Sequence, residues 1–165
     1  MSTYSTLETP AGPFTAVVDA DGAVLASGWT ADVGSLLPLV HPTLRPATAR
    51  QVADLGEVSD AIARYHDGDL GAVDDVPVRQ RSGPFLEQAW EVLRTVPAGA
   101  PVSYTEYASK AGRPAAVRAA ASACARNAAA LFVPCHRVLR NDGSLGGFRW
   151  GLPVKRWLLD HEATG

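Results

Sequence analysis

The residues best suited to chemistry in this sequence are a cysteine and the histidine directly after it, in the stretch Val133-Pro134-Cys135-His136-Arg137-Val138. A thiol attacks as its thiolate, and a histidine and an arginine beside it favour that form. The uncharged run at 128–133 ends at a proline, so the backbone is expected to leave regular structure just before the cysteine. A lone cysteine is also commonly a small buried apolar residue, so its surroundings must decide between these interpretations.

The chain has a second cysteine, Cys124, eleven residues before Cys135. There is no CxxC pair and no histidine at ligand spacing, so neither a disulfide framework nor a zinc site is predicted, and we assign Cys124 to packing. No stretch approaches the roughly 20 apolar residues of a membrane span, and the first residues lack the regions of a signal peptide. We therefore expect a cytoplasmic protein that needs no metal or other cofactor and no membrane.

The charge of the chain is divided unevenly, although its net value is only -2. Residues 1–78 carry three arginines against eleven acidic residues, a net charge of -8, whereas the remainder carries twelve basic residues against six acidic ones, a net charge of +6. Such asymmetry indicates nucleic-acid contact by the basic half, although an ordinary solvated surface would explain it as well.

The first half predicts an α/β domain over residues 1–82 with a small antiparallel sheet. Turn residues separate three β-prone runs at 4–9, 14–18 and 23–29, which is typical of a meander. Proline and glycine interrupt residues 30–48, which we interpret as mostly loop. Apolar residues three and four apart predict a helix over 52–66, and residues 73–78 are expected to be extended.

The second half, residues 83–165, is predicted to be mostly helical. A first helix runs over 85–96, and Ser103 with Glu106 forms a capping box for a second. An alanine-rich third helix follows over 115–126, so the last two helices and their glycine-containing turn suggest a helix-turn-helix. The small side chains fit either tight packing against a neighbour or entry into a DNA groove with Arg118 reaching the bases.

The tail after the cysteine combines glycines with planar side chains. Phe148, Arg149 and Trp150 lie between glycines and could form a hinged wall for a nucleobase, although a loop that merely turns the chain is the alternative. A last helix is predicted over 153–162. Its expected buried stripe consists of Val154, Trp157, Leu158 and His161.

Taken together, these residues resemble the O6-alkylguanine-DNA alkyltransferase family. The resemblance rests on the 133–138 stretch, on Ser103-Tyr104, Arg118 and Asn127, and on the ending at 155–162, and it covers residues 4–162. It implies a ribonuclease H-like N-terminal domain over 1–82 and a winged helix-turn-helix domain over 83–165. It also implies a single-turnover transfer of the alkyl group from O6-alkylguanine in double-stranded DNA to Cys135, by a monomer. O4-alkylthymine as a second substrate and cooperative binding to DNA are left open.

The resemblance also implies roles for individual residues. His136 takes the thiol proton through a water and is held by Glu162, while Asn127 braces the turn that carries Cys135. Because the sulfur lies inside the protein, the damaged base must leave the duplex, at a cost of about a few kcal/mol. Arg118 then fills the vacated stack and Tyr104 pushes the flanking phosphate. The other implied contacts are Ser103, Arg126, Ala119 and Ala123 at the DNA, and Pro134, Val138, Phe148, Arg149 and Trp150 in the base pocket.

Two positions depart from the family pattern. Phe148 stands where a tyrosine is usual, which removes a hydrogen bond to the base worth roughly 0.5–1.5 kcal/mol. Arg149-Trp150 replaces a small pair and resembles the C-terminal domain of the bacterial adaptive-response proteins. The indole of Trp150 is expected to admit a methyl group and to slow benzyl or larger groups, which the relative transfer rates of the two lesions test.

Two other classes of function compete with alkyl transfer. A DNA-binding module without chemistry, as in the alkyltransferase-like proteins, would lack the cysteine, so Cys135 argues against it. A cysteine hydrolase could use Cys135 and His136, but adjacency in sequence is a poor guide because such pairs normally come from distant segments.

Overall fold

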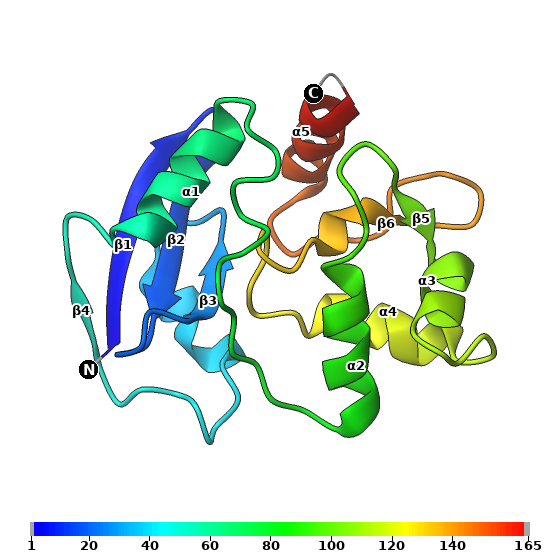
Figure 1. The fold of residues 1–165 in the computed structure, drawn as a ribbon, viewed down its shortest axis with the longest axis horizontal. Helices are drawn as coiled ribbons and strands as arrows, with labels where there is room; N and C mark the ends of the chain where they lie inside the picture. Colours follow the sequence, from blue (N-terminus) through cyan, green and yellow to red (C-terminus); the bar gives the residue numbers. More distant parts are fainter. Residues whose placement is uncertain (1, 164–165) are drawn as a thin grey trace. The chain divides into compact units, whose positions relative to one another are not determined.

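The computed structural model describes residues 2–163, and these form two units (Figure 1). One unit holds residues 2–81 and 128–132, and the other holds residues 82–127 and 133–163. The predicted domains are continuous segments, whereas the short segment 128–132 packs with the first unit. Ser27 donates its backbone N–H to the Ala128 carbonyl at 2.8 Å and its hydroxyl to the Ala130 carbonyl at 2.7 Å. Among the described helices, none is long and apolar enough to cross a membrane.

A four-stranded sheet in the order β3-β2-β1-β4 forms the first unit. β1 (Ser2–Thr9), β2 (Gly12–Val18) and β3 (Val24–Gly28) pair antiparallel, which confirms the predicted meander. β4 (Ala49–Gln51) pairs parallel with β1, so the sheet is mixed and the prediction of a purely antiparallel sheet is wrong. Three residues are too few to show a period of two, which is why the sequence pattern did not reveal β4.

α1 (Glu57–His66) begins later than predicted. The Val52 N–H donates to the Tyr4 carbonyl at 2.9 Å and so continues the pairing of β4 with β1 instead of starting a helix. Gly56 then turns the chain with a φ of 70°, a value that favours glycine. α1 buries one face, with Ile62 and Tyr65 fully enclosed.

Residues 73–78 were predicted to be extended, and this prediction is wrong for most of the segment. The backbone forms successive turns, in which the Asp74 N–H donates to the Gly71 carbonyl at 3.2 Å and the Val76 N–H donates to the Val73 carbonyl at 3.3 Å. Val78 is the exception, since it forms a parallel bridge with Val24. Turn hydrogen bonds within the segment therefore replace the strand pairing that the β-prone residues suggested.

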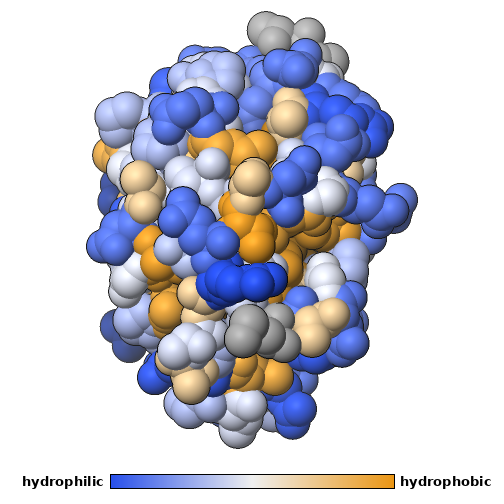
Figure 2. All heavy atoms as spheres, turned by 90° about the vertical axis from the view of Figure 1, so that its left-hand side faces the viewer, coloured by the Kyte–Doolittle hydropathy of each residue, from blue (hydrophilic) through white to orange (hydrophobic). Residues whose placement is uncertain are grey.

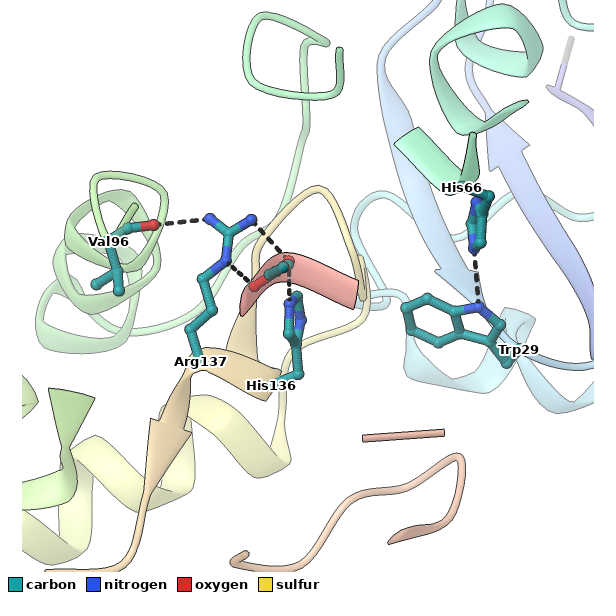
Figure 3. Close-up of polar contacts among 6 residues, drawn as sticks. Trp29, His66, Val96, His136 and Arg137 are labelled. Atoms are coloured by element: carbon teal, nitrogen blue, oxygen red, sulfur yellow. Dashed lines mark hydrogen bonds and ion pairs between the residues drawn. The ribbon is translucent and has the colours of Figure 1, made fainter. Parts of the chain in front are cut away.

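Aromatic side chains fill the core of the first unit. Phe14 packs edge-on against Trp29, with ring centroids 4.9 Å apart, and lies 6.4 Å from Phe132. The Trp29 indole N–H donates to His66 Nε2 at 3.3 Å (Figure 3). The other ring nitrogen of His66, Nδ1–H, donates to the Ile62 carbonyl at 2.7 Å. His66 is therefore a core residue of this unit, with both ring nitrogens used.

On the side where β1, β4 and α1 lie, hydrophobic side chains reach the surface between hydrophilic ones (Figure 2).

The second unit is mostly helical, as predicted. α2 (Pro84–Leu93), α3 (Tyr104–Lys110) and α4 (Val117–Ala125) pack against one another. The Tyr107 hydroxyl donates to the Ala89 carbonyl at 2.6 Å, and the Trp90 indole N–H donates to the Ala123 carbonyl at 2.8 Å. A small parallel pair was not predicted: β5 (Val102–Ser103) lies beside β6 (Val138–Leu139) and so joins the start of α3 to the segment after the cysteine.

α5 (Leu152–Ala163) forms where the last helix was predicted, but it buries a different face. The buried residues are Lys155, Leu158 and Glu162, so the predicted stripe is correct only at Leu158. Trp157 and His161 instead stack on each other, with ring centroids 4.5 Å apart. The spacing fits both faces, and the one with charged groups turns inward because those groups find hydrogen-bond partners inside the protein.

Candidate active site

Cys135 lies at the first position of a short 3-10 helix, η3 (Cys135–Arg137), and its side chain is partly exposed. The Val133 carbonyl holds this turn twice, because it accepts the Cys135 N–H at 2.8 Å and the Asn127 side-chain amide at 2.7 Å. The residue three positions before Pro134, Leu131, has a φ of 79°, in the left-handed region that non-glycine residues seldom adopt. The backbone before the cysteine is therefore sharply bent and fixed from the side by Asn127.

His136 is fully buried next to the cysteine, and it contacts a buried carboxylate. Its Nε2–H donates to Glu162 Oε2 at 2.7 Å, and its Nδ1 has no hydrogen-bond partner among the described residues. This pattern assigns the neutral tautomer with the proton on Nε2 and the lone pair on Nδ1. His136 is thus prepared to accept a proton at Nδ1.

Arg137 holds the same carboxylate, a contact that the sequence did not predict (Figure 3). Its Nε donates to Glu162 Oε1 at 2.9 Å, and its Nη2 donates to Glu162 Oε2, also at 2.9 Å. Its Nη1 donates to the Val96 carbonyl at 2.7 Å, so three of its nitrogens are fixed in a buried environment. Such a bidentate contact fixes the plane of the carboxylate and thereby the orientation of the His136 ring.

The protonation of this group of residues follows from its burial and contacts. Burial alone raises the pKa of Glu162, but the hydrogen bonds and charges of His136 and Arg137 outweigh it and lower the pKa to about 2. Burial lowers the pKa of His136, against the opposing effect of Glu162. At neutral pH the resting state is therefore an ionised Glu162, a charged Arg137 and a neutral His136.

Lys155 is a second residue of this site that sequence reasoning missed as a functional group. Its side chain is 1% exposed, and its Nζ donates to the Val138 carbonyl at 3.0 Å. The ammonium also lies 5.9 Å from the centre of the Phe148 ring, which places Phe148 beside a buried cation. The available signal was the i, i+3, i+7 spacing of Lys155, Leu158 and Glu162 on one helix face.

Ser103 and Tyr104 begin α3. The Ser103 hydroxyl accepts the Glu106 N–H at 3.0 Å and Glu106 Oε1 accepts the Ser103 N–H at 2.9 Å, which confirms the predicted capping box. Tyr104 is half-buried against Gly146, where an added Cβ would lie 2.9 Å from its hydroxyl. Burial raises the pKa of Tyr104 to about 12, with a further contribution from Cys124 and Cys135, so this hydroxyl stays protonated.

The two arginines of the predicted DNA surface lie in α4, at Arg118, and directly after it, at Arg126. Arg118 and Arg126 are exposed and Ala119 is half-buried, so these three remain available to a partner. Ala123 is fully buried and its carbonyl accepts the Trp90 indole N–H. This face of α4 packs against α2, and the role of Ala123 as a DNA contact stays a prediction.

The predicted pocket residues divide by burial. Pro134 and Val138 are buried, whereas Phe148 and Trp150 are half-buried. Arg149 is exposed, and its Nη2 donates to the Ala125 carbonyl at 2.6 Å. Arg149 therefore ties the glycine-rich loop to the end of α4, while the place of Trp150 in a pocket wall stays a prediction.

Several known proteins similar to this chain are named as methyltransferases that act on methylated DNA. Residues 84–164 match the family model described as 6-O-methylguanine DNA methyltransferase, DNA binding domain. The chain is 32% identical over 158 residues to the methylated-DNA–protein-cysteine methyltransferase of Shigella flexneri, which covers 94% of this chain and 92% of that protein. It is also 45% identical over 121 residues to the bifunctional transcriptional activator/DNA repair enzyme Ada of Escherichia coli (strain K12).

The match to Ada covers 72% of this chain but only 34% of Ada, so the chain spans about a third of that relative. Among solved structures, the chain is similar to Mycobacterium tuberculosis OGT in complex with DNA, with a TM-score of 0.81 and 28% identity. That similarity covers 98% of this chain and 93% of the other.

Proposed function

Because the chain belongs to the methylated-DNA–protein-cysteine methyltransferases, we propose that it repairs O6-alkylguanine in double-stranded DNA by moving the alkyl group onto Cys135. The observation that supports Cys135 as the acceptor is the buried group of His136, Glu162 and Arg137 beside it, which leaves an unused acceptor at His136 Nδ1. No described group of His, Cys, Asp and Glu side chains could hold a metal ion, and the proposed reaction uses none.

The first step activates the sulfur. The Cys135 thiol gives its proton to His136 Nδ1 through a bridging water, while Glu162 stabilises the imidazolium that forms. Arg137 keeps Glu162 ionised and oriented throughout. Proton transfer of this kind contributes about 10²–10⁴-fold to a rate.

The second step is an in-line displacement at an sp3 carbon. The Cys135 thiolate attacks the alkyl carbon, a sulfur–carbon bond forms and the carbon–O6 bond breaks. The electron pair stays on guanine, which takes up the proton held by His136. The product is a thioether, and because water does not hydrolyse a thioether, each molecule acts once.

DNA binding is assigned to the second unit. In this proposal α3 and α4 form a helix-turn-helix, with the residues near β5 and β6 as its wing, and the first unit is a ribonuclease H-like scaffold. The small side chains on α4 suit entry into the minor groove. Arg118 then takes the place of the flipped base and Tyr104 contacts the flanking phosphate.

Mass spectrometry after incubation with O6-methylguanine DNA tests the proposal. We expect one methyl group on Cys135, a stoichiometry of one per molecule and no turnover. The variant Cys135→Ala should bind the same DNA but never take up a methyl group. Methylation of that variant would show that another residue is the acceptor, repeated turnover would favour a hydrolase, and binding without modification of the natural protein would favour a non-catalytic lesion binder.

A further inference from the structure

Lys155 is a buried cation whose charge has no carboxylate partner. The side chain is 1% exposed in the middle of α5, and among residues 2–163 its ammonium donates one hydrogen bond, to the Val138 carbonyl at 3.0 Å. Within the described part of the chain, no carboxylate oxygen lies within 4 Å of this ammonium. A buried charge is costly unless an opposite charge compensates it, and burial accordingly lowers the pKa of Lys155, so a negative charge nearby would stabilise the ammonium.

The group that can supply this negative charge is the Cys135 thiol, which loses its proton in the proposed reaction. Burial lowers the pKa of Lys155, while Cys135 and, to a smaller extent, Cys124 raise it again. Burial raises the pKa of the Cys124 thiol strongly, so Cys124 stays protonated. Burial raises the pKa of Cys135 as well, but a hydrogen bond from Asn127 opposes this and the adjacent His136 has an unused proton acceptor, so Cys135 is the thiol whose charge can balance Lys155.

The backbone places the ammonium at the end of the turn that carries the sulfur. Val138, whose carbonyl accepts the Lys155 proton, directly follows the 3-10 helix that begins at Cys135. The Phe148 ring lies on another side of the ammonium, 5.9 Å from it, where a ring face attracts a cation. These two contacts hold the Lys155 ammonium in place, but neither supplies a full negative charge.

Other groups near the Cys135 sulfur contribute less to stabilising its negative charge. Burial raises the pKa of Cys135, against a hydrogen bond from Asn127 and the charges of Lys155 and Arg149. Arg149 is exposed to solvent, which screens its charge, and it is bound to the Ala125 carbonyl. The remaining titratable groups that interact with this cluster are Cys124, Tyr104, Tyr107, His136 and Arg140. Lys155 is therefore the cation best shielded from water.

We propose that Lys155 is a positioning residue whose buried ammonium stabilises the Cys135 thiolate that forms when His136 takes up the thiol proton. This inference rests on the proposed function of Cys135, and it adds a third component to the site besides the histidine base and the glutamate–arginine pair. Lys155 acts through the sulfur: it stabilises the charge that His136 creates by taking the proton.

The pH dependence of Cys135 reactivity tests this without DNA. All proteins carry Cys124→Ala, so that Cys135 is their one thiol, and they react with iodoacetamide, a neutral electrophile, between about pH 6 and pH 11, a range that extends above the ordinary thiol pKa because burial raises the pKa of Cys135. We expect the midpoint of the rate profile to rise by about one pH unit or more in both Lys155→Met and Lys155→Gln. Methionine removes the charge and the hydrogen bond, whereas glutamine removes the charge and can still donate to the Val138 carbonyl.

The control is Arg156→Gln, which removes an exposed cation from the next position of the same helix and should leave the midpoint unchanged. An unchanged midpoint in a folded Lys155→Met protein would overturn the proposal. A normal midpoint in Lys155→Gln alone would also overturn it, since the hydrogen bond rather than the charge would then be the important feature. Circular dichroism melting establishes that each variant is folded.

A second measurement needs no variant at Lys155. The ammonium is titrated by NMR before and after carbamidomethylation of Cys135, and replacing the thiolate by a neutral thioether should lower the pKa of Lys155. An unchanged titration would contradict the proposal even if both variants fail to fold. Neither experiment uses DNA, so the two proposals can fail separately. If the expected shifts are found but no methyl group is taken up from O6-methylguanine DNA, the proposed function is overturned, while the effect of Lys155 on the Cys135 thiolate still stands.

Discussion

At the scale of single residues, Glu162 connects the components of the site. One carboxylate accepts hydrogen bonds from His136 Nε2 and from two nitrogens of Arg137, all within 2.7–2.9 Å. A histidine–carboxylate pair alone would leave a buried negative charge, which Arg137 compensates. Glu162 is therefore expected to contribute to stability as well as, in the proposed mechanism, to the activation of Cys135.

Glu162→Gln should lower both the stability of the protein and the rate of alkyl transfer. Removing the carboxylate leaves Arg137 buried without its counter-charge, so we expect a loss of about 3–5 kcal/mol in the free energy of unfolding and at least a hundredfold slower transfer. Urea denaturation and single-turnover kinetics measure the two effects. In the double variant with Arg137→Met the unpaired charge is absent, so its loss of stability should be clearly smaller than the sum of the single variants; strict additivity would mean that the pair is not coupled.

The same carboxylate predicts a pH dependence of stability. Its pKa in the folded protein is about 2, below the ordinary value of 4.5, so the unfolded chain takes up the proton first as the pH falls. The stabilisation is complete above about pH 4.5 and is lost as the pH approaches 2. Urea denaturation across this range should show a steeper loss for the natural protein than for Glu162→Gln, and parallel curves would contradict the assignment.

Gly146→Ala tests the position of Tyr104. A Cβ at residue 146 would lie 2.9 Å from the Tyr104 hydroxyl, so the ring must move, and we expect about tenfold slower transfer with little change in melting temperature. Gly147→Ala is the matched control, because a Cβ there meets nothing within 4 Å. Single-turnover rates on O6-methylguanine DNA compare the two. Equal rates would mean that the Tyr104 position does not limit the reaction.

At the scale of elements, Ser103 connects the small sheet to α3. It pairs with Leu139 across β5 and β6 and caps α3 through the Glu106 N–H. Ser103→Ala should cost about 1 kcal/mol of unfolding free energy, because α3 has only seven residues and depends on its cap. Ser109→Ala, in the last turn of the same helix, should change stability by less than about 0.5 kcal/mol. A similar small effect for Ser103→Ala would show that packing alone holds α3.

The elements also show how far the sequence could be interpreted. Strong local signals, such as the capping box at Ser103 and the turns between β1, β2 and β3, predicted their structures correctly. β4 was missed because its pairing with β1 is long-range and too short to leave a pattern. The face of α5 was wrong because two faces have helical spacing, and only the buried partners of Lys155 and Glu162 decide between them.

The same contrast between local signals and long-range contacts applies to the site residues. Cys135 and His136 were predicted as site residues from a local stretch of sequence, whereas the contact of His136 with Glu162 spans 26 residues and was expected from the family resemblance alone. The two contacts of Arg137 and the buried position of Lys155 depend on how α5 is rotated, which no local pattern specifies.

At the scale of the whole molecule, the charge is divided between the two halves of the chain, with a net charge of -8 over residues 1–78 and +6 over the remainder. Part of the basic excess is not available to DNA, since Arg137 and Lys155 are buried in the site. The exposed arginines Arg118 and Arg126, at opposite ends of α4, remain as candidate phosphate contacts. Binding by such contacts releases counterions and weakens as salt rises.

This division predicts the salt dependence of DNA binding. Arg118→Ala and Arg126→Ala should each reduce the slope of log K against log salt concentration by about 0.9, the change for one lost phosphate contact. Arg64→Ala removes an arginine from the acidic half, where it pairs with Asp60 and Asp69, and should leave the slope unchanged. Fluorescence anisotropy with undamaged duplex DNA isolates this electrostatic effect from recognition of the lesion. An equal decrease for all three variants would mean that the slope reports net charge, and a decrease for Arg64→Ala alone would place the DNA on the first unit.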